Sequence, residues 1–101
     1  MQSANEMNHC KHVSALVIFY EGNHAGGIVA HYGDTGRVTA TLQIWEGPLK
    51  MPTKTTRAGG GGYDKLGHCL ERMLGADCPQ GGETSVYSWM RDKGYRVIKA
   101  V

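Results

Sequence analysis

The segment Val38-Thr39-Ala40-Thr41-Leu42-Gln43-Ile44 carries the clearest structural pattern in the chain. Apolar and polar residues alternate through it, and successive side chains of a β-strand point to opposite faces. The alternation therefore predicts a strand with one face in the core and the other in contact with water.

Two apolar runs precede this strand. Val13 to Tyr20 is β-branched and aromatic and ends at Glu21-Gly22-Asn23, which predicts a mostly buried, central strand. Gly27 to Tyr32 predicts the next strand. Gly33-Asp34-Thr35-Gly36 has the residue types of a tight turn, so we expect it to join this strand to Val38–Ile44 as a hairpin.

Two weaker strand patterns follow. Gly47-Pro48 ends the third strand, and Pro52 delays the next one until Thr53 to Arg57, which has the composition of a short, charged edge strand. Tyr95 to Val101 alternates again and predicts a final strand.

Two helices are expected between these strands. After four consecutive glycines, apolar residues recur at three- and four-residue spacing from Tyr63 to Leu74, which predicts an amphipathic helix closed by Gly75. Thr84 or Ser85 is a suitable N-cap for a second, short helix that ends at Gly94. This helix carries Val86, Tyr87, Trp89 and Met90.

Together these patterns predict an α+β fold. A mainly antiparallel sheet of four to five strands is covered by two helices, in the order β-β-β-(β)-α-α-β. The chain has 101 residues, too few for two domains. We expect a flexible polar tail over residues 1–12 and a single domain over residues 13–101.

Charge and hydropathy exclude several classes of protein. Eleven Lys and Arg against nine Asp and Glu give a net charge of +2, which is neither the strong basicity of a dedicated nucleic-acid binder nor the acidity of a DNA mimic. The longest apolar run, Ala15 to Tyr20, is too short to span a bilayer. The first residues lack the pattern of a secretory signal, so we expect a cytoplasmic protein.

The cysteines and histidines do not form a recognisable chemical site. Three cysteines are an odd number, which favours reduced thiols over a disulfide framework. No paired Cys or His knuckle is present, so we expect no metal and no cofactor. His68 and Cys69 are adjacent and diverge by roughly 100° around a helix, which prevents a direct base–nucleophile pair. The sequence therefore favours a protein that is not an enzyme.

The most distinctive segment is basic and rich in glycine. Between Glu46 and Asp64 it has no acidic residue, and its cations lie close to a predicted helix start, where backbone amides favour an anion. One interpretation is a binding surface, and the other is a flexible connection between a strand and a helix. The candidate binding residues of this segment are Lys50, Lys54, Arg57, Gly60, Gly62, Tyr63 and Lys65.

The second helix offers a further candidate. Trp89 and Met90 cannot both point inward on a short helix, so Trp89, Met90 or Trp45 of the third strand is expected as an exposed anchor. Ordinary partial burial of these side chains is the alternative.

The segment from Lys54 to Leu66 resembles a Gly-x-Gly-Tyr-Asp-Lys signature of small phage and prophage proteins, and the residues that match this motif are Gly60, Gly62, Tyr63, Asp64 and Lys65. The resemblance covers this segment and brings no catalytic residues. It implies a phage-encoded accessory protein, and many such proteins bind host machinery, including CRISPR and restriction systems.

The sequence thus leads to two functional hypotheses. The first is a non-enzymatic phage or prophage protein that binds and inhibits or modulates a host protein or ribonucleoprotein, for example a CRISPR or other defence nuclease. A homodimer would present its binding surface twice. The alternative is a nucleic-acid-binding protein that uses the basic Lys50–Lys65 segment directly.

Overall fold

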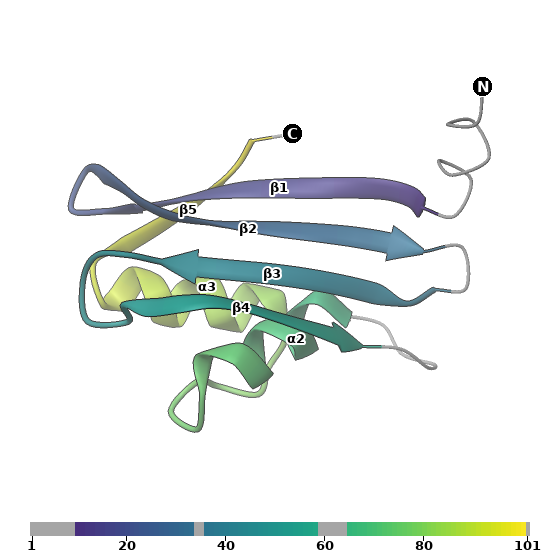
Figure 1. The fold of residues 1–101 in the computed structure, drawn as a ribbon. Coiled ribbons are helices and arrows are strands. Elements are labelled where there is room, and N and C mark those ends of the chain that lie inside the picture. The colour runs from purple at the N-terminus through teal and green to yellow at the C-terminus, as the bar shows by residue number, and fades with distance from the viewer. Residues whose placement is uncertain (1–9, 34–35, 59–64, 101) are drawn as a thin grey trace.

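The structure, a computed structural model, describes residues 10–33, 36–58 and 65–100 (Figure 1). Five strands form one antiparallel sheet in the order β4-β3-β2-β1-β5, and two helices accompany it, which confirms the predicted α+β fold. The elements are β1 (Cys10–Tyr20), β2 (Asn23–Gly33), β3 (Val38–Ile44), β4 (Met51–Ala58), α2 (Lys65–Leu74), α3 (Glu83–Asp92) and β5 (Tyr95–Lys99).

The chain path explains which strands lie at the edges. β1 to β4 follow one another as antiparallel neighbours, so β4 ends on one edge, as predicted for a charged strand. After the two helices the chain returns to the opposite edge, where β5 pairs with β1. The first strand is therefore interior to the sheet, in agreement with its apolar sequence.

Several strand boundaries differ from those expected. β1 begins at Cys10, so Cys10–His12 of the expected tail belong to the strand, while residues 1–9 lie outside the described residues. β2 begins at Asn23, four residues before Gly27. β4 includes Pro52, because an edge strand tolerates a residue without an N–H and the β3–β4 register shifts at this point.

The expected N-cap of the second helix was wrong. α3 begins at Glu83 with Gly82 as its N-cap, and the first helical bond runs from Val86 N to Gly82 O (3.0 Å). The N–H of Gly82 donates to Oε2 of Glu71 on α2 (3.0 Å). A buried carboxylate from the preceding helix thus holds the start of α3, and Thr84 lies inside the first turn.

Both helices pack on one face of the sheet. α2 contacts β3 and β4, and α3 contacts α2 and β5 (Figure 1). The core between sheet and helices contains fully buried side chains from both layers, among them Ile18, Ile28, Leu42, Ile44, Leu70, Val86 and Met90. Neither described helix is long and apolar enough to cross a membrane.

Candidate binding surface

The sheet has a second face, on the side away from α2 and α3, which we call the open face. It is made by the strand residues that alternate with the buried ones. On β2, for example, Ile28 is fully buried under the helices, while its neighbour Val29 is 39% exposed and lies opposite Ala15 of β1. Within residues 10–33, 36–58 and 65–100, the large apolar side chains that are exposed all belong to this face, namely Val13, Val29, Trp45 and Ile98.

An aromatic cluster marks one end of the open face. The ring of His24 lies between Phe19 (5.9 Å between centroids) and Trp45 (4.9 Å). Two hydrogen bonds hold the cluster: Trp45 Nε1 donates to the carbonyl oxygen of His24 (3.1 Å), and His24 Nε2 donates to that of Gly26 (3.1 Å). The three rings therefore occupy fixed positions.

A bulge in β2 places His24 on this face. Ile18 pairs with Gly26 and Phe19 pairs with His24, so Ala25 is an extra residue that reverses the alternation. At Gly26 the neighbouring strand comes so close that a Cβ would collide with the carbonyl oxygen of Gln43. Only glycine fits this position, and it allows β2 and β3 to approach each other closely beside Trp45.

The strands of the sheet carry Lys and Arg side chains but no carboxylate side chains. None of the five strands contains Asp or Glu, and the carboxylates of the described chain lie in turns and helices. On the open face the register places Arg57 opposite Thr39, and Arg96 opposite Phe19. The open face thus combines an apolar centre with cationic side chains near both sheet edges.

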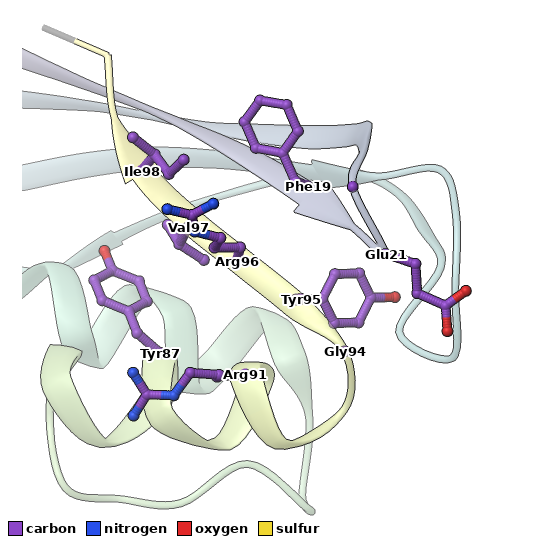
Figure 2. A pocket seen from close by; sticks show the side chains of 10 residues that line it. Phe19, Glu21, Tyr87, Arg91, Gly94, Tyr95, Arg96, Val97 and Ile98 are labelled. Atoms are coloured by element: carbon purple, nitrogen blue, oxygen red, sulfur yellow. The ribbon is translucent and has the colours of Figure 1, made fainter.

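A cleft of about 630 Å³ continues from the open face around the edge of β5. Figure 2 shows Tyr87 and Arg91 of α3 on one side of it and residues of β5, including Arg96 and Ile98, on the other. Arg91 and Arg96 are both exposed. The cleft therefore has an apolar wall and two guanidinium groups.

Tyr95 fixes the start of β5 beside this cleft. Its hydroxyl donates to the carbonyl oxygen of Glu46 (2.7 Å) and accepts a bond from Leu49 N (2.9 Å). Burial raises the pKa of this phenol, and the bond from Leu49 opposes the shift. Its ring also packs on Tyr20 (4.9 Å), so side-chain contacts tie β5 to the β3–β4 connection.

The structure separates two cations that the sequence analysis grouped together. Lys54 pairs with the buried Leu42 and points to the helix side, where its Nζ donates to the carbonyl oxygen of Met73 (3.4 Å). Arg57, three residues later, points to the open face, and its own carbonyl oxygen accepts a bond from Arg72 (2.7 Å). Residues an odd number of positions apart on a strand lie on opposite faces.

The other candidates are also dispersed. Lys50 is exposed in the turn before β4, and Lys65 is half-buried at the start of α2, near Gly36. Trp89 is half-buried against the core, and Lys93 lies 5.0 Å from its ring centroid. Gly60, Gly62 and Tyr63 lie outside the described residues. Met90 is fully buried, so Trp45 is the most exposed of the three suggested anchors.

Cys69 and Cys78 are buried free thiols. Burial raises the pKa of Cys69, against the opposing effect of Arg72, and burial together with the charge of Glu71 raises that of Cys78. Both thiols are therefore weak nucleophiles. His68 contacts Glu71 (3.4 Å), and across residues 13–33, 36–58 and 65–100 no three His, Cys, Asp or Glu side chains gather as metal ligands.

The open face itself was missed by the sequence analysis, although a signal for it was present. In β1, Val13, Ala15, Val17 and Phe19 alternate with Leu16, Ile18 and Tyr20, so both faces of the strand are apolar. The sequence analysis predicts from it only a mostly buried, central strand. The helices α2 and α3 cover one face of the five strands, so the β1 series that begins at Val13 and ends at Phe19 has no described helix above it.

Comparison with known proteins finds no match for this chain: no family model fits it, and no curated protein or solved structure is significantly similar to it.

Proposed function

We propose that this chain is a non-enzymatic binding protein that recognises a partner protein with the open face of its sheet. The observation that carries this proposal is the gathering of exposed Val13, Val29, Trp45 and Ile98 on one face. Contiguous exposed apolar surface with a polar rim is typical of protein interaction sites.

The residue types of the open face suit a protein interface. Trp and Arg are enriched among the residues that dominate binding energies, and Trp45, Arg57 and Arg96 all lie on this face. The hydrogen bond and ring contacts of Trp45 hold its side chain before binding, so less conformational entropy is lost on association.

The resemblance of Gly60–Lys65 to a segment of phage and prophage proteins supplies the biological setting of the proposal. In this setting the chain acts in the cytoplasm of a bacterial host and inhibits or modulates a host macromolecule such as a CRISPR or other defence nuclease. Inhibition would follow from steric masking, which needs a complementary surface and no catalytic group.

A second candidate is binding of single-stranded nucleic acid. It is favoured by the absence of carboxylates from all five strands and by the rings of Phe19, His24 and Trp45, on which bases can stack. The basic Lys50–Lys65 segment contributes less than expected to such a surface, because Lys54 points to the helix side.

A site-specific cross-linking experiment separates the two candidates. A photo-reactive amino acid replaces Val29 on the open face or, as control, exposed Thr84 on α3. After irradiation of bacterial cells we expect a defined protein adduct from position 29 and none from position 84. A nucleic-acid adduct at position 29 would favour the second candidate, and equal labelling from both positions would contradict a role for the open face.

A further inference from the structure

β5 leaves part of its backbone unpaired. Ala100 N donates to Ala15 O (2.8 Å), and Glu21 N donates to Gly94 O (3.1 Å). In antiparallel strands the hydrogen-bonding residues alternate, so the residues at even positions from 94 to 100 face β1. The backbone N–H and C=O groups of Val97 and Lys99 consequently point away from the sheet.

This edge is open in the described part of the chain. The strand order ends at β5, and no described residue bonds to the outward groups of Val97 or Lys99. The cleft between β5 and α3 runs beside Val97 (Figure 2). Unpaired strand edges are templates for an additional strand.

The charges along the cleft favour an anionic occupant. Arg91 on α3 and Arg96 on β5 lie on its two sides, and neither forms an ion pair with a described carboxylate. Among the residues that the structure describes, Glu21, at the turn end, supplies the one carboxylate that lines the cleft. Guanidinium groups bind carboxylates with paired, charge-assisted hydrogen bonds.

We propose that an extended, acidic segment of a partner protein adds to the edge of β5 as a sixth strand. The proposal rests on the proposed function and names how the partner is held. Its backbone bonds to Val97 and Lys99. Because alternate side chains of a strand point to opposite faces, its carboxylates meet Arg91 on the α3 side and Arg96 on the open-face side.

The same edge disfavours a second copy of this chain. β5 carries Arg96 and Lys99 and no acidic residue, so two β5 strands side by side would bring like charges together. Like charges on paired strands are destabilising. An acidic strand turns this repulsion into attraction, which selects the partner by charge.

The test begins with a display library of random linear peptides selected on the full-length protein. We expect enrichment of β-branched sequences with carboxylates at alternate positions. A synthetic copy of an enriched peptide is then bound to the protein, and amide hydrogen exchange is measured by NMR. The amides of Val97 and Lys99 should gain protection, while those of Arg96 and Ile98, which already face β1, should change little.

Charge reversal supplies matched variants. Arg91→Glu with Arg96→Glu should weaken binding of the peptide at least about tenfold, because like charges then face each other. Arg37→Glu with Lys50→Glu makes the same change in net charge at exposed positions outside the cleft and should leave the affinity within about twofold.

Three results would overturn the strand addition: no enriched peptide, enrichment without carboxylates, or binding that leaves Val97 and Lys99 unprotected. Val29→Lys distinguishes this failure from that of the proposed function. With the photo-reactive amino acid moved to exposed Gln43 of the same face, this variant should lose the cross-link of a partner to the open face and preserve binding of the acidic peptide at the β5 edge.

Discussion

Both faces of the sheet carry large apolar side chains, but in opposite environments. On β2, Ile28 is fully buried against the helices, and Val29, the next residue, is 39% exposed. The covered face is apolar because it forms the core. The same explanation does not apply to the open face, since its valines and Ile98 have no described helix above them. Core formation therefore does not account for these side chains, and we propose that they contact a partner.

The largest expected effect comes from removing a side chain from the covered face. Ile28→Ala leaves a cavity between sheet and helices and should lower the free energy of unfolding by about 2–5 kcal/mol. Val29→Ala on the open face should lower it by less than about 1 kcal/mol. Urea unfolding followed by circular dichroism measures both, and equal losses would show that the two faces do not differ.

Gly26 and Gly27 of β2 should differ sharply in how well they tolerate a side chain. Gly26→Ala places a Cβ against the carbonyl oxygen of Gln43, a backbone atom that cannot rotate aside as a side chain can. The substitution should therefore lower the free energy of unfolding by about 1–3 kcal/mol. In Gly27→Ala the Cβ would meet Leu16 O at 3.5 Å, an ordinary contact, so we expect a change within about 0.5 kcal/mol. Thermal unfolding of the two variants is the measurement, and a tolerated Gly26→Ala would contradict the close approach.

Loss of one hydroxyl group should loosen the strand that borders the cleft. Tyr95→Phe leaves the carbonyl of Glu46 and the N–H of Leu49 without this partner and should cost about 1–2 kcal/mol. Tyr87→Phe removes a part-buried bond to Glu83 (2.7 Å) and should cost less than about 1 kcal/mol. Guanidinium unfolding monitored by fluorescence compares them, and the reverse ranking would contradict the anchoring role of Tyr95.

Alkaline pH should lower the free energy of unfolding gradually and by a smaller amount. The pKa values of Cys69 and Cys78 are raised above 9.0 mainly by burial, and that of Tyr95 above 10.0, so the folded state retains protons that the unfolded chain releases. Stability is therefore constant below the unfolded values and falls as the pH rises through the folded ones. Urea unfolding between about pH 8 and pH 10 tests the sign, and Cys78→Ala should flatten the slope.

The fold could be predicted from the sequence because its signals are local. Alternation in β3, the glycine turns and the amphipathic pattern of α2 each depend on a few neighbouring residues. The start of α3 could not be predicted, since it depends on the carboxylate of Glu71, on another helix, accepting a hydrogen bond from the N–H of Gly82. That contact spans eleven residues and leaves no local pattern.

The binding surface was harder to predict for a related reason. Lys54 and Arg57 are close in sequence and were treated as one patch, whereas strand alternation separates them. Conversely, Trp45, which directly follows β3, and His24 of β2 are far apart in sequence and meet only through the β2–β3 pairing and the bulge at Ala25. Surface patches on sheets are assembled across strands, so proximity along the chain is a poor guide to them.

The smallest effect on stability should come from the residues with the largest expected effect on binding. Val13→Thr, Val29→Thr and Ile98→Thr keep β-branched side chains on the strands and replace exposed apolar surface by hydroxyl groups, so each should change the free energy of unfolding by less than about 0.5 kcal/mol. The triple variant should nevertheless elute earlier from a hydrophobic-interaction column and lose the cross-link from a photo-reactive amino acid at Gln43 of the open face.

Such a separation of stability from surface properties is what a binding face requires, because the groups that contact a partner contribute little to folding. A triple variant that unfolds cooperatively at much lower urea concentration would instead make Val13, Val29 and Ile98 part of the structural core, and the contrast between the two faces would disappear. Unchanged stability with unchanged retention and cross-linking would remove the open face from the binding surface and leave the β5 edge as the place where a partner attaches.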